Sequence, residues 1–200
     1  MLTREEIQKK TLIRLVDDDE DLRDTFSTML SYEGWHVKTY ATAQAFLADD
    51  QPSMPGCLIL DVRLPGMTGT ELQSALVERG YQIPIIILTG HANVDLAVTS
   101  FKQGAADFLQ KPVDEAKLIE VITQLARNSL LEALGIPTGK RLVFALETLT
   151  ERERAVMALM KEGVPPQQIA LRLGISERTV YVHRVSIYQK LGTHHIELLD

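Results

Sequence analysis

Short, almost continuously apolar runs alternate with amphipathic stretches through the first part of the chain. Three of these runs, at 12–16, 57–60 and 83–88, consist mainly of Leu, Ile, Val and Cys. Such runs are typical of strands that helices cover on both faces of a parallel sheet. Weaker runs at 36–40 and 107–110 predict two further strands.

Between these strands, apolar residues recur with the spacing of a helix face. The periodicity predicts five helices, at about 20–32, 43–49, 69–79, 93–103 and 114–133. Strand–helix repeats joined by short connections predict a doubly wound α/β domain, with a five-stranded parallel sheet, over residues 10–128. In such sheets the ligand site lies at the carboxyl ends of the strands.

The pattern changes after residue 128. Gly and Pro punctuate the next segment, and we predict a linker over 129–148. Only helical periodicity follows, so we expect an all-α domain over 149–200. Capping signals predict its helices, one starting at Thr150 with a capping box, then two more at about 165–174 and 176–191, and a short one near His194.

Charge is divided unevenly between these two parts. Residues 1–128 hold 12 Lys and Arg against 19 Asp and Glu, whereas residues 129–200 hold 9 against 8. The single cysteine, Cys57, excludes an internal disulfide and fits a reducing compartment. With no apolar run of about 18 residues and a charged start, we expect neither a membrane span nor a signal peptide, and a cytoplasmic location.

Polar side chains of particular kinds stand at the predicted strand ends. Asp17 and Asp18 follow the first strand, Asp61 closes the third, Thr89 ends the fourth and Lys111 follows the fifth. Clustered carboxylates repel one another unless a divalent cation neutralises them, and hard oxygen ligands favour Mg²⁺. One carboxylate can then attack a phosphoryl donor, while a lysine and a hydroxyl hold the remaining oxygens.

At these positions the chain resembles the receiver domains of two-component response regulators. The resemblance rests on Val16–Glu20, Leu60–Gly69, Leu88–His91 and Phe108–Pro112 and covers roughly residues 10–128. It implies that a sensor histidine kinase supplies a phosphoryl group to Asp61. It further implies roles for the surrounding residues: Mg²⁺ binding by Asp17, Asp18, Asp61 and the backbone carbonyl of Arg63, and phosphoryl binding and switching by Thr89, Lys111 and Phe108.

The C-terminal part resembles the LuxR-type helix-turn-helix domains of quorum-sensing and nitrate-response regulators. The resemblance rests on Leu149–Arg154, Ile169–Ala170, Leu173–Val180, His183–Arg184 and Lys190–Gly192. The helix at 176–191 would then enter the major groove of double-stranded DNA. The residues implied in DNA binding are Arg178, Thr179, Tyr181, Val182, Arg184, Val185 and Lys190.

The predicted DNA-facing stripe contains few charges. The family often has Lys where Tyr181 stands, and apolar residues such as Val182 and Val185 can touch a thymine methyl but cannot attract phosphate. We therefore expect weak non-specific DNA binding. The stripe also leaves open an alternative, in which the C-terminal helices bind a protein partner instead of DNA.

A second alternative is a phosphohydrolase with Asp61 as nucleophile. Such hydrolases usually carry a second Asp two residues later, and Arg63 stands there, so we expect a signalling protein rather than an enzyme. Because the chain stops shortly after the last predicted helix, we expect any dimer to form through the receiver, after phosphorylation, at about 93–103 and 114–125.

Overall fold

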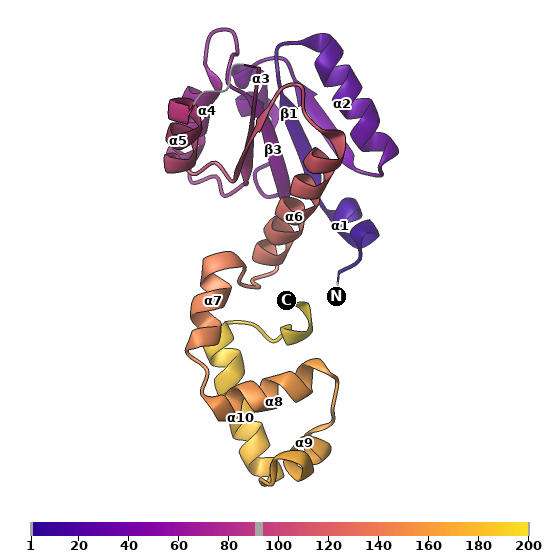
Figure 1. Ribbon diagram of the computed structural model, residues 1–200, viewed down its shortest axis with the longest axis vertical. Coiled ribbons are helices and arrows are strands. Elements are labelled where there is room, and N and C mark those ends of the chain that lie inside the picture. The colour runs from indigo at the N-terminus through magenta and orange to yellow at the C-terminus, as the bar shows by residue number, and fades with distance from the viewer. Residues whose placement is uncertain (1, 91–93, 200) are drawn as a thin grey trace. The chain divides into compact units, whose positions relative to one another are not determined.

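The computed structural model describes residues 2–90 and 94–199, which form two compact units (Figure 1). The N-terminal unit spans Thr3–Leu130, and the C-terminal unit contains the residues from Leu131 onward together with Leu2. His91, at the end of one motif, and residue 93, at the start of a predicted helix, lie outside the described residues. No helix in the described ranges has the length and apolar character that crossing a bilayer requires.

The N-terminal unit is built on a five-stranded parallel sheet, as the sequence predicts. Its strands pair in the order β2-β1-β3-β4-β5. The chain therefore reverses its direction of winding between β1 and β3, and the carboxyl ends of these two strands flank the switch point. The strands are β1 (Leu12–Val16), β2 (His36–Tyr40), β3 (Gly56–Asp61), β4 (Ile85–Thr89) and β5 (Asp107–Gln110).

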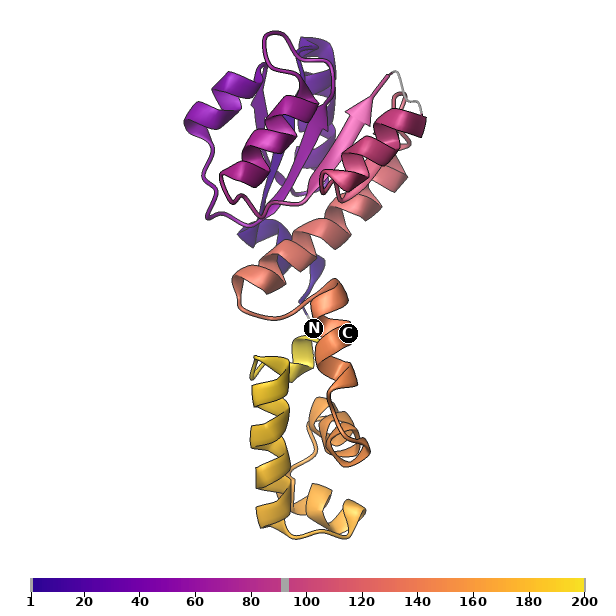
Figure 2. The ribbon, with the colours of Figure 1, turned by 90° about the vertical axis from the view of Figure 1, so that its left-hand side faces the viewer.

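Helices cover both faces of this sheet. The five predicted helices are α2 (Glu20–Tyr32), α3 (Ala43–Asp49), α4 (Gly69–Glu78), α5 (Val94–Lys102) and α6 (Glu115–Ala133). Helices α3, α4 and α5 lie on one face and α2 and α6 on the other (Figures 1 and 2). Alternate strand residues supply the two layers of core: Leu58 and Leu60 pack with Phe46 and Leu72, whereas Ile59 is buried on the other side.

A short helix, α1 (Arg4–Lys10), precedes the sheet and was not predicted. Thr3 and Glu6 form a reciprocal capping box: the Glu6 N–H donates to Thr3 Oγ1 at 3.2 Å, and the Thr3 N–H donates to Glu6 Oε2 at 2.8 Å. The capping-box spacing is visible in the sequence. The segment that follows it is short and mostly charged, however, and contains no apolar stripe that would predict a helix.

An arginine is completely buried in β1, inside a run that the sequence pattern assigns as apolar. Arg14 Nε donates to Asp50 Oδ1 at 2.5 Å, and its Nη2 donates to the carbonyls of Gln51 and Met54 at 2.7 and 2.9 Å. Because these three bonds run to the α3–β3 connection, the buried charge holds this connection against the central strand, while Nη1 donates to the Leu12 carbonyl within β1 at 3.1 Å.

The C-terminal unit is all-helical. It contains α7 (Gly139–Glu147), α8 (Glu151–Lys161), α9 (Pro166–Leu173), α10 (Glu177–Leu191) and a 3₁₀ turn, η1 (Ile196–Leu198). The last four confirm the predicted helices, whereas α7 lies in the segment predicted as a linker. Gly174 ends α9 in the left-handed conformation, at φ 64°, and this sharp turn leads into α10. Val156, Ile169, Val180 and Ile187 are buried between these helices.

Candidate functional site

The carboxyl ends of the strands bring five predicted site residues to one edge of the sheet in the N-terminal unit. Asp17 directly follows β1, and Asp61 and Thr89 are the last residues of β3 and β4. All three side chains are buried, whereas Asp18, one residue further on, is exposed. The register aligns Val16 with Leu60, so the two buried aspartates leave the sheet side by side.

Lys111 joins these carboxylates. Its Nζ donates to Asp17 Oδ2 at 2.6 Å and to Asp61 Oδ2 at 3.0 Å. The backbone N–H of Lys111 donates to the Thr89 carbonyl at 2.8 Å, which extends the β4–β5 ladder by one bond and places the lysine over the pocket. The Lys111–Pro112 peptide bond is cis.

The pocket holds more negative than positive charge. One oxygen each of Asp17, Asp18 and Asp61 lie within 4.8 Å of one another. Burial raises the pKa of Asp17 above its usual value, although hydrogen bonds from Lys111 and from the Asp19 N–H counter this. Burial would lower the pKa of Lys111, but its bonds to Asp17 and Asp61 outweigh that effect and raise it. Three carboxylates around one ammonium group fit a divalent cation with hard oxygen ligands, such as Mg²⁺.

Backbone groups fix the orientation of the two buried aspartates. Asp17 Oδ1 accepts from the N–H of Asp19 at 3.0 Å, and Asp61 Oδ1 accepts from the N–H of Arg63 at 3.3 Å. Helix α4 starts directly behind Asp61, because the Gly69 N–H donates to the carbonyl of Val62 at 2.9 Å. A Cβ at position 69 would lie 2.1 Å from the Asp61 carbonyl oxygen, so only glycine allows this close approach.

Two predicted residues lie around this pocket with different surroundings. The side chain of Arg63 is exposed, beside the bond that its own N–H makes to Asp61. Phe108 is half-buried on β5, where it pairs with Ile87 and packs against the core beneath α4. The structure thus places Phe108 next to the strand that ends in Thr89.

In the C-terminal unit, α9 and α10 form a helix-turn-helix. Ser176 caps α10, accepting from the N–H of Thr179 at 3.1 Å, as the sequence predicts. The opposite face from the buried Val180 and Ile187 is open to solvent: Tyr181 is 67 % exposed, Val182 58 % and Val185 37 %. We call this face, with the exposed Arg178 and Gln189 at its two ends, the reader stripe.

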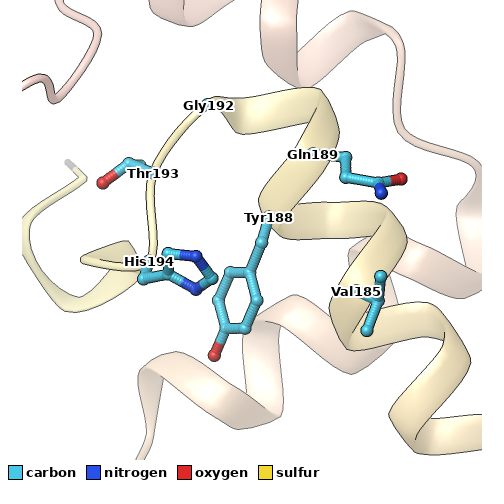
Figure 3. Close-up of a pocket in the computed structure, with 6 residues that line it drawn as sticks. All are labelled: Val185, Tyr188, Gln189, Gly192, Thr193 and His194. Atoms are coloured by element: carbon cyan, nitrogen blue, oxygen red, sulfur yellow. The ribbon is translucent and has the colours of Figure 1, made fainter.

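The other side of α10 packs against the end of the chain. Figure 3 shows Val185 and Gln189 on one side of the helix and Tyr188 on the other, where its ring meets His194. The two ring centroids are 4.4 Å apart. Arg184 lies on this side too, half-buried, with Nη2 3.3 Å from the Tyr188 hydroxyl. Of the predicted DNA-binding arginines, Arg178 is therefore exposed and Arg184 is partly engaged within the unit.

The buried carboxylate of Glu153, which the sequence predicts only as part of a helix cap, accepts hydrogen bonds from three groups. Glu153 Oε2 accepts from Lys190 Nζ at 2.7 Å and from the Thr150 N–H at 2.7 Å, and Oε1 accepts from the Ser186 hydroxyl at 2.6 Å. Burial would raise the pKa of Glu153, but these bonds outweigh it and lower the pKa to about 2. Lys190, predicted as a DNA contact, is thus ion-paired inside its own unit.

Comparison with known families also divides the chain into an N-terminal and a C-terminal part. Residues 13–123 match the family described as response regulator receiver domain, and residues 147–199 match the family of bacterial regulatory proteins of the luxR type. The chain is 37 % identical over 179 residues to the transcriptional regulatory protein FixJ of Rhizobium meliloti (strain 1021), covering 90 % of this chain and 88 % of that protein. It is 41 % identical over 194 residues to the C4-dicarboxylate transport transcriptional regulatory protein DctR of Rhodobacter capsulatus, covering 92 % and 94 %.

Solved structures give the same result. The response regulator StyR matches with a TM-score of 0.60 and 36 % identity, covering 95 % of this chain and 98 % of that one. Full-length FixJ from B. japonicum matches with a TM-score of 0.60 and 33 % identity, covering 95 % and 94 %. Both parts of the chain, in the same order, therefore have counterparts in single proteins.

Proposed function

The chain belongs to the response regulators that join a receiver domain to a luxR-type DNA-binding domain, and from this premise we propose that Asp61 is the residue whose phosphorylation controls transcription. Membership of this family makes the chain a signalling protein, with a kinase as phosphoryl donor and DNA as partner. It does not favour a C-terminal unit that binds a protein instead. The observation that supports Asp61 is the ion pair of Lys111 with both Asp61 and Asp17, beside exposed Asp18.

In the proposed reaction an oxygen of Asp61 attacks the donor's phosphorus. The new bond is an acyl phosphate, and the bond from phosphorus to the leaving group breaks with its electrons going to that group. Mg²⁺ would be held by Asp17, Asp18, Asp61 and the Arg63 carbonyl, and would offset charge on the transferring group. The ammonium group of Lys111 already contacts Asp61, so it is in place to donate a hydrogen bond to an oxygen of the phosphoryl group once that group is attached.

Replacement of Asp61 by Asn tests this assignment. The amide is not a nucleophile, so the variant should take up no acid-labile phosphate from acetyl phosphate with Mg²⁺, while its circular dichroism stays unchanged. Asp24→Asn, on the exposed surface of α2, is the matched control and should be labelled like the parent chain. Labelling of the Asp61 variant at the parent level would refute the proposal.

We further propose that phosphorylation is passed on through β4 and β5. Thr89 and Lys111, which would bind the phosphoryl oxygens, end β4 and follow β5, respectively. Phe108 on β5 pairs with Ile87 and packs against the core. Helix α5 follows β4 and presents Val94, Val98 and Phe101 at 78 %, 46 % and 50 % exposure, one stripe at helical spacing. An exposed apolar stripe coupled to the pocket suits a contact between two activated receivers.

Sedimentation velocity with beryllofluoride and Mg²⁺ tests this second step. The chain should shift from monomer to dimer, and Phe101→Glu should stay monomeric because the contact would bury its charge. Asp61→Asn is the control that beryllofluoride should not shift. A parent chain that stays monomeric while its DNA affinity rises would leave release of the DNA-binding unit as the sole consequence of phosphorylation.

On the DNA side we propose that Arg178, Thr179, Tyr181, Val182, Arg184, Val185 and Lys190 line the contact. The exposed charge of Arg178 suits attraction to a phosphate, whereas Glu153 partly neutralises Lys190. The contribution of Lys190 to salt dependence should accordingly be smaller than that of Arg178.

A further inference from the structure

The centre of the reader stripe cannot make the bidentate hydrogen bonds that usually identify bases. Tyr181, Val182 and Val185 occupy it, and Arg178 and Gln189 lie one turn away at either end. Bidentate recognition of guanine needs Arg or Lys, and that of adenine needs Asn or Gln. The tyrosine hydroxyl is the single polar atom that these three central side chains offer.

The apolar surface at this place is large. Val182 and Tyr181 are more than half exposed, although Val180, Ile187 and Leu191 on the opposite face are almost fully buried. The core of the unit is therefore supplied by the opposite face of α10, and nothing within the unit covers the apolar side chains of the reader stripe. In the major groove one base presents an apolar group, the C5-methyl of thymine.

We propose that Tyr181, Val182 and Val185 recognise thymine methyl groups at the centre of each half-site. This inference rests on the proposed DNA-binding role of α10 and assigns it a chemical specificity. Residues 181–185 advance about 6 Å along the helix, at 1.5 Å per residue, and base pairs are stacked about 3.4 Å apart. The stripe thus spans about two neighbouring base pairs, so a half-site should carry two adjacent thymines there, on one strand or across both.

Uracil substitution isolates this contact, because uracil differs from thymine only in lacking the methyl group. A binding sequence is first selected with the full chain phosphorylated by acetyl phosphate. Duplexes are then made with uracil in place of single thymines of that sequence, and their affinities are measured at one salt concentration. Removing one buried methyl group should weaken binding about four-fold, and removing both about fifteen-fold.

Protein variants assign the effect to the stripe. Val182→Ala should bind the thymine duplex more weakly and should bring the ratio of thymine to uracil affinity towards one. Leu171→Ala is the matched control, because Leu171 is an exposed apolar residue (82 %) of α9 that lies outside the stripe. This control should keep the parent ratio.

The outcomes separate this inference from the role on which it rests. If the chain binds a selected sequence but uracil changes its affinity less than two-fold at every thymine, methyl recognition is refuted and DNA binding stands. A methyl effect that Val182→Ala leaves intact refutes the assignment to the stripe. If no sequence is selected, both this inference and the DNA-binding role of α10 fail.

Discussion

Each unit of the chain pairs a lysine with buried carboxylate, and the two clusters have opposite properties. In the C-terminal unit, Lys190 meets one carboxylate, and both oxygens of Glu153 have further donors in Ser186 and the Thr150 N–H. In the N-terminal unit, Lys111 is shared by Asp17 and Asp61, with Asp18 close by. The comparison shows that the balance of charges and donors, rather than the residue types, decides whether the charge of a paired carboxylate is fully compensated.

The pKa shifts express this difference. The pKa of Glu153 falls to about 2, so its ionised form fits the folded state better than it fits water. The pKa of buried Asp17 is raised, so its charge is held at some cost. A cation bound among these carboxylates would relieve that cost, whereas Glu153 already has a donor at each oxygen.

Removing the satisfied carboxylate should have the largest effect on stability. Glu153→Ala leaves Lys190, Ser186 and the Thr150 N–H without their acceptor and should lower the free energy of unfolding of the C-terminal unit by about 3 kcal/mol. Urea unfolding should show helix loss by circular dichroism at lower urea, while fluorescence of the single Trp35, buried in the other unit, keeps its midpoint. Glu151→Ala, exposed on the same helix, should change neither; a shift of the Trp35 transition instead would contradict the assignment.

Acid should reduce the contribution of Glu153 to the free energy of unfolding, by somewhat less than its replacement by Ala does. Because the pKa of Glu153 is about 2 in the folded state and near 4.5 otherwise, its stabilisation is complete above about pH 4.5 and is lost as pH falls towards 2. The difference in unfolding free energy between the parent and Glu153→Gln should therefore shrink by about 2 kcal/mol between pH 5 and pH 2.5. A difference that is constant over this range would show that ionisation of Glu153 does not matter.

Removing a carboxylate from the pocket of Asp17, Asp18 and Asp61 should raise stability rather than lower it, and the change should be the smallest of the three. Asp18→Asn removes one of three neighbouring carboxylates, so without Mg²⁺ the N-terminal unit should become more stable, by up to about 1 kcal/mol in the Trp35 transition. Stabilisation of this unit by added Mg²⁺ should be reduced in the same variant. Asp24→Asn should change neither quantity, and a destabilised Asp18→Asn chain would mean that Asp18 has a structural role.

The sequence predicts the sheet and the convergence of the pocket residues for a simple reason. Parallel strands bring their carboxyl ends to one edge, so Asp17, Asp61, Thr89 and Lys111 meet wherever the strands are correctly identified. Periodicity and capping similarly predict α8, α9 and α10. These features depend on local pattern and on one general rule of topology.

What the sequence does not predict depends on contacts between distant segments. The capping role of Glu153 follows from the spacing to Thr150, but its bond to Lys190 requires α8 and α10 to be packed together. The burial of Arg14 could not be predicted from the apolar run around it, because its partner Asp50 lies 36 residues further along the chain. Helix α7 has a cap residue, Thr138, without a side-chain cap bond, so its start carried little signal.

The absence of a side chain at Gly69 has a genetic consequence. Every single-nucleotide missense change in a glycine codon adds at least a Cβ, and here that atom would lie 2.1 Å from the backbone oxygen of Asp61. Helix α4 would have to move away from the strand that carries the proposed phosphorylation site. Codon 69 should therefore yield loss-of-function alleles as readily as codon 61, although glycine takes no part in the chemistry.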